Sequence, residues 1–213
     1  MAKYYMGIDV GTFETKGVLV DERYHVVATH SAKHTMENPR PNFFEQDAEA
    51  VWWHDCCAVS KGLLADTGID ARDIAGVGCD VLGCDCLPVD EQCRPLRKAI
   101  LYGIDARASE EIAFLHAHYG PERVRSLFGH TLCSDDIAPK ILWIKNHEPE
   151  VYAKTYKFLT GSSYVTAKLT GEYVIDRFLA KSSFEPLYTE TGAINEAEAG
   201  LFCRGDQLAR AMD

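Results

Sequence analysis

A glycine-containing turn between two β-prone runs constrains this chain more than any other feature. The segment reads Met6-Gly-Ile-Asp9-Val-Gly11-Thr12-Phe-Glu-Thr15-Lys16-Gly-Val-Leu-Val20. Gly11 has no Cβ, so the backbone can bend there and approach a ligand closely. Exposed N–H groups in such a turn form a concave anion site. Thr12 and Thr15 add hydroxyl groups, Lys16 adds a positive charge, and Asp9 offers a carboxylate for Mg²⁺. These residue types favour phosphate binding together with a metal ion.

The order strand–turn–strand separates this segment from the Walker loop, which leads into a helix and requires Gly-x-x-x-x-Gly-Lys-[Ser/Thr]. A β-hairpin with a polar tip is the structural alternative. Gly-Ile-Asp-Val-Gly-Thr followed by Lys16 resembles the first phosphate motif of the actin, Hsp70 and sugar-kinase superfamily. Glu14 lies in the same turn, and we expect it to face solvent, since it would repel a bound phosphate.

The composition is that of a folded protein. Hydrophobic residues make up 46% of the 213 residues, and the formal net charge is −10. An acidic chain without a basic block is a poor binder of nucleic acid. No apolar run approaches the roughly 20 residues of a membrane span, and the N-terminus enters a strand without a signal peptide. We therefore expect a cytoplasmic protein with no nucleic-acid or membrane partner.

Eight cysteines are more than such a chain usually carries. Without a secretion signal a disulfide framework is not expected. Cys79, Cys84 and Cys86 cluster in the sequence and raise the alternative of a metal or Fe–S site. Because Cys-x-x-Cys is absent, buried or incidental free thiols are the favoured interpretation. The eight histidines are expected at the surface or in hydrogen bonds.

Hydrophobic periodicity and turn residues predict alternating strands and helices. We expect strands at 4–9, 16–22, 24–31, 74–80, 86–89 and 99–102, and helices at 45–64, 109–119, 136–147, 150–156, 163–169 and 207–212. Asp47 is a candidate N-cap, Gly171 a candidate C-cap, and Asp206 an acid at a helix start. This order predicts an α/β fold of the ribonuclease H-like type, with a mixed sheet flanked by helices.

Later segments resemble one branch of this superfamily, the FGGY carbohydrate kinases. The matching segments are Phe44-Glu45-Gln46-Asp47 before Trp52-Trp53, Gly83 to Asp90 with Arg94 to Tyr102, Asp105-Ala-Arg107, Ala138 to Trp143 with His147 to Glu150, and Leu169 to Glu172 with Asp176. They follow the family order from Tyr5 to about Ser183. This family, which the chain resembles, includes xylulokinases and glycerol kinases. It implies ATP-dependent phosphorylation of a sugar or polyol hydroxyl, with ATP and Mg²⁺.

The resemblance also implies roles for individual residues. Asp9 would support a metal or catalysis, and Gly11, Thr12, Thr15 and Lys16 would lie on the phosphate side. Asp105 and Arg107 are candidate sugar contacts, because a carboxylate accepts and a guanidinium donates hydrogen bonds to a polyol. The alternative for this pair is a local salt bridge that fixes a loop. Asp80 and Asp85 are further candidate sugar contacts, or else solvated turn acids.

Three departures from the family pattern limit what the resemblance implies. The Gly-Gln-Met-His-Gly of xylulokinases is replaced by Val81-Leu82-Gly83-Cys84-Asp85, so D-xylulose is not implied. The Trp-Asn-Asp of many members is Tyr102-Gly-Ile-Asp here. The Gly-Gly-x-x-Asp segment with the family's catalytic base is missing. We expect residues 1–213 to be an incomplete N-terminal domain, without the second, nucleotide-binding domain and inactive alone.

Two other functions stay open at this point. The first is a non-catalytic binding or assembly module with an actin-like fold, since the base and the adenosine domain are missing. The second is an ATPase like the dehydratase activases, which hold an Fe–S cluster at a dimer interface. A homodimer is an open expectation for any of these functions.

Overall fold

The computed structural model describes residues 3–212, and their contacts divide the chain into two compact units. The first unit comprises residues 3–36 and 47–82, and the second comprises residues 37–46 and 83–212. The sequence predicts a single incomplete domain over 1–213. The chain passes from the first unit into the second at residue 37, returns at residue 47 and leaves again after residue 82.

The first unit is a four-stranded mixed sheet. Its strands are β1 (Tyr4–Val10), β2 (Glu14–Asp21), β3 (Val26–Lys33) and β6 (Ile74–Val81), in the order β3-β2-β1-β6. β1 pairs antiparallel with β2 and parallel with β6, while β2 pairs antiparallel with β3. A parallel pair needs a crossover connection, and here the crossover contains a helix. These strands confirm the expected mixed sheet.

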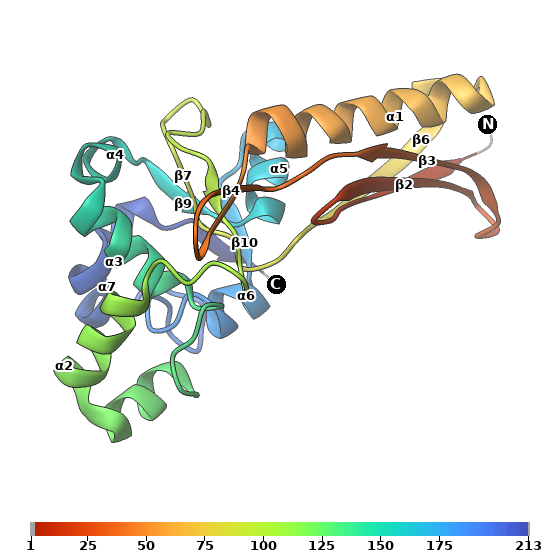
Figure 1. The fold of residues 1–213 in the computed structure, drawn as a ribbon. Helices are drawn as coiled ribbons and strands as arrows, with labels where there is room; N and C mark the ends of the chain where they lie inside the picture. The colour runs from red at the N-terminus through yellow and green to blue at the C-terminus, as the bar shows by residue number, and fades with distance from the viewer. Residues whose placement is uncertain (1–2, 213) are drawn as a thin grey trace. The chain divides into compact units, whose positions relative to one another are not determined.

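That crossover helix covers one face of the sheet (Figure 1). It begins as a π-helical segment (Ala48–Trp53) and continues as α1 (His54–Thr67). The carboxylate of Asp47 accepts the N–H groups of Glu49 and Ala50, so the predicted N-cap is confirmed. Gly17 allows the helix to approach, because a Cβ there would lie 2.3 Å from Val59 Cγ1. Trp52, Ile8, Val10, Leu19, Val59 and Leu63 form the core between them.

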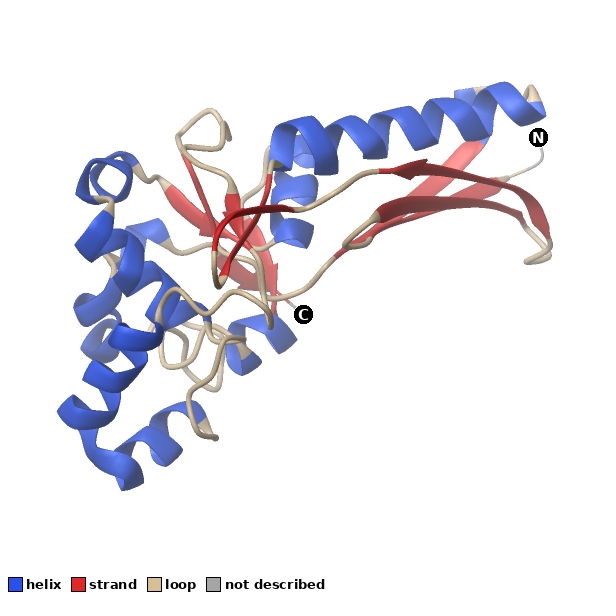
Figure 2. Ribbon diagram, in the orientation of Figure 1, coloured by secondary structure: helices blue, strands red, loops and turns tan. Residues whose placement is uncertain are grey.

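The second unit combines helices with short strands (Figure 2). Its helices are α2 (Ser109–Phe128), α3 (Ile137–His147), α4 (Pro149–Lys154), α5 (Gly161–Thr170), α6 (Arg177–Ser182) and α7 (Glu196–Phe202). No helix within residues 3–212 is both long and apolar enough to cross a bilayer. Gly171 ends α5 in the left-handed conformation with φ 78°, as its position predicted.

Short strands of the second unit pair segments that lie far apart in the sequence. β4 (Glu37–Arg40), β5 (Phe43–Gln46) and β8 (Ala99–Ile100) form one sheet in that order. β7 (Leu87–Val89) pairs antiparallel with β9 (Lys157–Leu159), and β10 (Val174–Asp176) pairs parallel with β11 (Arg210–Met212). The sequence pattern did not predict β4, β5, β10 or β11.

Two helix expectations are corrected. The helix expected over 109–119 continues as α2 to Phe128, across a kink at Gly120 with φ 74° and ψ 161°. Pro121 then starts the second segment, where its missing N–H costs no helical hydrogen bond. The helix expected over 207–212 is absent. A 3₁₀ turn (Gly205–Gln207) leads instead into β11, and the Arg210 N–H donates to the Tyr173 carbonyl.

Candidate active site

The turn between β1 and β2 is tight because of Gly11. Its N–H donates to the carbonyl of Glu14 at 3.0 Å, and a Cβ on Gly11 would lie 3.1 Å from that oxygen. Thr12 is half-buried in the turn. The turn predicted to bind phosphate therefore lies at the end of β1. Its position alone does not distinguish a phosphate-binding turn from a β-hairpin with a polar tip.

Three charged side chains stand in a row across β2, β1 and β6. Lys16 is the register partner of Asp9, and Asp9 is the register partner of Asp80. Register partners on neighbouring strands point to the same face of a sheet. Lys16 Nζ lies 3.4 Å from Asp9 Oδ2, with the two side chains 60% and 54% exposed. An ion pair this exposed contributes little to stability. Its charges are accessible to a ligand.

A hollow of about 770 Å³ lies against this row, on the face of the sheet opposite the core residue Val10. Asp9, Lys16 and Asp80 belong to its lining, and so does Glu14. The Ser31 hydroxyl donates to Glu14 Oε1 at 2.9 Å, so this carboxylate turns toward β3. Glu14, which was expected to face solvent, is half-buried and lines the same hollow as Lys16.

The donor set of the row fits a hard divalent cation. Neighbouring strands lie about 4.8 Å apart, so the carboxylates of Asp9 and Asp80 project side by side from β1 and β6. Carboxylate oxygens are the protein ligands that Mg²⁺ prefers, usually one or two of them together with water and phosphate. Lys16 adds the positive charge that a phosphate needs on the other side of Asp9.

Thr15 lies on the opposite face from Lys16. Its side chain is fully buried, and its hydroxyl donates to Asp55 Oδ2 at 3.3 Å. Side chains alternate along β2, so that of Thr15 points toward α1. This geometry disfavours the expected direct contact of Thr15 with phosphate. Asp55 and its partner His34 were not among the predicted site residues, because no short motif marks them.

Asp105 and Arg107 form a buried ion pair, as the structural alternative for them predicted. Arg107 Nη2 lies 2.7 Å from Asp105 Oδ2, with side chains 1% and 0% exposed. Arg107 also donates to Glu45 Oε1 at 2.8 Å, and Asp105 accepts the Phe44 N–H at 2.6 Å. Two motifs far apart in the sequence thus meet in one ionic cluster. Both charges are satisfied within the protein, which favours the local salt bridge over direct sugar contact.

The guanidinium of Arg107 is also covered by aromatic rings. It lies 4.3 Å from the centroid of Phe43 and 5.0 Å from that of Trp143. Trp143 is buried in α3. Although burial alone would lower it, pairing with Asp105 and Glu45 raises the pKa of Arg107. The cluster therefore stays charged.

Asp80 and Asp85 differ in their surroundings. Asp80 is exposed on β6, whereas Asp85 is fully buried in the second unit. Asp85 accepts the Tyr102 N–H at 3.2 Å, and burial raises its pKa to about 6. The buried Lys140, whose Nζ donates to the Leu101 carbonyl at 3.1 Å, attracts the Asp85 charge. Asp85 is therefore not the solvated turn acid of the alternative.

The eight cysteines are free thiols. Cys79 lies in the first unit, and Cys84 and Cys86 lie in the second. Within residues 3–212 these three thiols do not form a metal-binding group.

Residues 4–184 match the model of the N-terminal domain of the FGGY family of carbohydrate kinases. The chain belongs to this family. The match spans parts of both compact units and replaces the dehydratase-activase alternative. The fold is accordingly the ribonuclease H-like fold of the actin, Hsp70 and sugar-kinase superfamily.

Curated relatives in the family act on several sugars. The xylulose kinase of Escherichia coli K12 is 34% identical over 172 residues, which is 81% of this chain and 34% of the relative. The L-xylulose/3-keto-L-gulonate kinase of the same organism is 30% identical over 80% of the chain and 34% of its own length. The chain thus spans about a third of the length of these curated relatives.

Solved structures agree with the fold. A xylulose kinase from Rhodospirillum rubrum superposes with a TM-score of 0.87 at 26% identity, covering 99% of this chain and 43% of that one. Glycerol kinase from Plasmodium falciparum has a TM-score of 0.83 at 19% identity, over 99% of this chain and 43% of its own, and shows the fold alone.

Proposed function

We propose that this chain is the N-terminal part of an ATP-dependent carbohydrate kinase, which transfers the γ-phosphoryl group of ATP to a sugar or polyol hydroxyl. The row of Lys16, Asp9 and Asp80 beside the Gly11 turn carries the proposal, within a domain of the FGGY family. A positive charge and two carboxylates beside a tight glycine turn are what phosphoryl transfer requires for positioning and charge stabilisation.

Each residue of the row has a proposed task. Lys16 and the Thr12 hydroxyl bind phosphate oxygens, while Gly11 keeps the turn tight through the bond from its N–H to the Glu14 carbonyl. Asp9 and Asp80 hold Mg²⁺, which neutralises phosphate charge when it is bound. Asp80 is thereby proposed for the metal side in addition to the sugar side expected from the sequence. Thr15 acts from the core, where its bond to Asp55 fixes the start of β2.

The acceptor is proposed to be a ketose or a related polyol. Relatives of this chain are named as kinases of xylulose, L-xylulose or 3-keto-L-gulonate, and L-fuculose-type sugars. Asp85 accepts the backbone N–H of Tyr102. The cluster of Asp105, Arg107 and Glu45 fixes the neighbouring loop. We propose that these residues shape the sugar side from within the fold, since the Arg107 charge is paired with Asp105 and Glu45.

The proposed activity also suggests where the protein works. A kinase of this kind works in the cytoplasm, where ATP is supplied. A homodimer stays a prediction.

Sugar-dependent release of ADP tests the proposed function. The full-length protein that carries this chain should form ADP from Mg-ATP only when a ketose or polyol acceptor is present. Lys16→Ala should lower kcat/KM by about 10–100-fold, as expected for losing a charge-assisted hydrogen bond. Lys33→Ala is the matched control, because Lys33 is an exposed lysine at the end of β3. Absence of ADP across pentuloses, hexuloses and polyols would instead support the non-catalytic binding module.

A further inference from the structure

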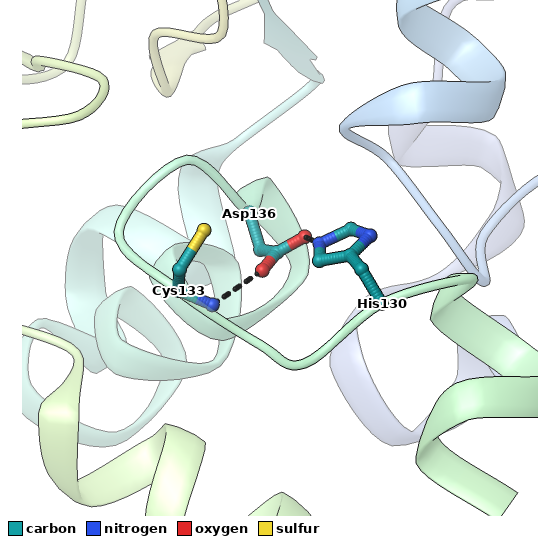
Figure 3. A group of neighbouring side chains, drawn as sticks. All are labelled: His130, Cys133 and Asp136. Carbon is teal, nitrogen blue, oxygen red and sulfur yellow. Dashed lines mark hydrogen bonds and ion pairs between the residues drawn. The ribbon is translucent and has the colours of Figure 1, made fainter.

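A histidine, a cysteine and an aspartate converge in the loop between α2 and α3 (Figure 3). The ligand atoms of His130, Cys133 and Asp136 all lie within 4.8 Å of one another. No other group of three or more histidine, cysteine, aspartate or glutamate side chains in residues 3–212 meets this criterion. The cluster lies apart in the sequence from the row Lys16, Asp9 and Asp80, in the other compact unit.

Local structure holds the three side chains in place. Gly129 ends α2 in the left-handed conformation with φ 73°, which turns the chain into the loop. The loop ends at Asp136, the N-cap residue of α3. Asp136 Oδ1 lies 2.9 Å from His130 Nε2, and its Oδ2 accepts the Cys133 N–H at 2.7 Å. The carboxylate therefore connects the first and second ligand candidates before any ion is bound.

Burial and charge favour a cation at this point. The Asp136 side chain is 1% exposed. Asp135 and Glu185 add negative charge nearby, since Asp135 acts on Cys133 and Glu185 interacts with both His130 and Asp136. Lys140 is the opposing positive charge, but its ammonium is bonded to the Leu101 carbonyl. A buried carboxylate among further acids is stabilised by a divalent ion.

We propose that His130, Cys133 and Asp136 bind a Zn²⁺-class ion that links the end of α2 to the start of α3. Thiolate, imidazole and carboxylate together are the donor set of zinc, whereas Mg²⁺ and Ca²⁺ select oxygen alone. Three protein ligands leave a fourth tetrahedral position for water. Cys133 is exposed and His130 is 41% exposed, so an ion can enter from solvent.

The geometry needs only a small adjustment. With metal–ligand distances of about 2.0–2.3 Å, tetrahedral ligand atoms are roughly 3.3–3.7 Å apart. His130 Nε2 and Asp136 Oδ1, now 2.9 Å apart, would have to separate slightly. The Cys133 thiol, which lies within 4.8 Å of the other two ligand atoms, would have to move closer to them. On binding, the thiol proton leaves to solvent, and the imidazole proton moves from Nε2 to Nδ1. The metal affinity should therefore increase with pH as the thiol ionises.

Cobalt titration of the metal-free chain tests the site directly. Under reducing, anaerobic conditions, Co²⁺ should bind in one equivalent and give a thiolate-to-metal charge-transfer band, which added Zn²⁺ removes. Cys133→Ser should abolish this band and weaken binding by more than the roughly 10–100-fold that loss of an outer-shell partner causes. Cys133 is exposed, so this variant is expected to fold, and circular dichroism checks that it does.

Two further variants make the test specific. Cys57→Ser is the matched control, because Cys57 is a partly exposed thiol on α1, outside the cluster, and its loss should leave the band unchanged. His130→Gln should shift the visible cobalt bands and lower affinity. Absence of the charge-transfer band in the unmodified chain, or its persistence in Cys133→Ser, would overturn the proposal. Neither result depends on kinase activity, so the proposed function is tested separately.

Discussion

His34 joins the Gly11 turn to Asp55 under the sheet. Its Nε2 lies 2.9 Å from the Gly11 carbonyl oxygen, and its Nδ1 lies 2.8 Å from Asp55 Oδ2. Both partners are hydrogen-bond acceptors, so a ring nitrogen donates wherever it carries a proton. The side chains of His34 and Asp55 are only 7% and 8% exposed. This buried bridge fixes the conformation of the proposed phosphate-binding turn from its core side.

Replacing His34 by alanine should destabilise the chain. The variant removes two hydrogen bonds and leaves the Gly11 carbonyl and the Asp55 carboxylate with fewer donors. We expect a loss of about 1–3 kcal/mol in the free energy of unfolding, measured by urea denaturation. His25→Ala is the control, because His25 is exposed and pairs with Asp21 at the surface. Equal stability of the two variants would show that the His34 bridge does not hold the turn.

Asp9→Asn should weaken magnesium dependence more than it weakens stability. The Asp9 carboxylate is about half exposed and its pair with Lys16 contributes little to folding. We therefore expect a nearly unchanged unfolding free energy together with a markedly higher Mg²⁺ concentration for half-maximal ADP formation in the full-length protein. Asp73→Asn, a half-buried acid just before β6 and outside the hollow, serves as the comparison. An unchanged Mg²⁺ requirement would remove Asp9 from the proposed metal site.

Arg107→Met should be one of the most damaging single changes in the second unit. It leaves the carboxylate of Asp105 buried without its partner, and removal of one member of a buried pair costs about 3–5 kcal/mol. Arg107→Lys should restore only part of this loss, because an ammonium lacks the planar fork that reaches both Asp105 and Glu45. Denaturant unfolding measures both variants. A small effect of Arg107→Met would mean that the pair faces a ligand and not the core.

The Asp85 carboxyl should titrate near pH 6. Burial raises its pKa to about 6, while the unfolded carboxyl titrates at about 3.9. The folded state then holds the proton more tightly, so this stabilising contribution is complete below pH 4 and is lost as the pH rises through 6. Carbon-detected NMR of the side-chain carboxyl follows the midpoint, and Asp85→Asn assigns the signal. A midpoint near 4 would contradict the buried position.

Local signals in the sequence predicted much of the fold. Asp47 caps the helix after β5, and Gly171 ends α5, because a carboxylate at a helix start and a glycine after its last turn are recognisable without tertiary context. The alternation in β1 and β2 likewise predicted the strands beside the Gly11 turn. These features depend on neighbours along the chain, which a sequence displays directly.

Features that depend on distant partners were missed. β11 is a strand because Arg210 to Met212 pair with β10, although the same residues have a helical pattern. Thr15 was assigned to phosphate, yet its partner Asp55 lies 40 residues away. The loop cluster of His130, Cys133 and Asp136 escaped a search for paired cysteines or paired histidines, since it mixes three residue types. Tertiary packing decides each of these cases.

Sugar-dependent ADP formation by the full-length protein, compared between the unmodified protein and Lys16→Ala, tests the central claim most directly. The account predicts ADP only with a ketose or polyol acceptor, and about 10–100-fold lower kcat/KM in the variant. The unfolding free energy of the variant should stay close to that of the unmodified protein, because Lys16 is 60% exposed. Equal kcat/KM in both proteins would contradict the placement of phosphate at the Lys16, Asp9 and Asp80 row.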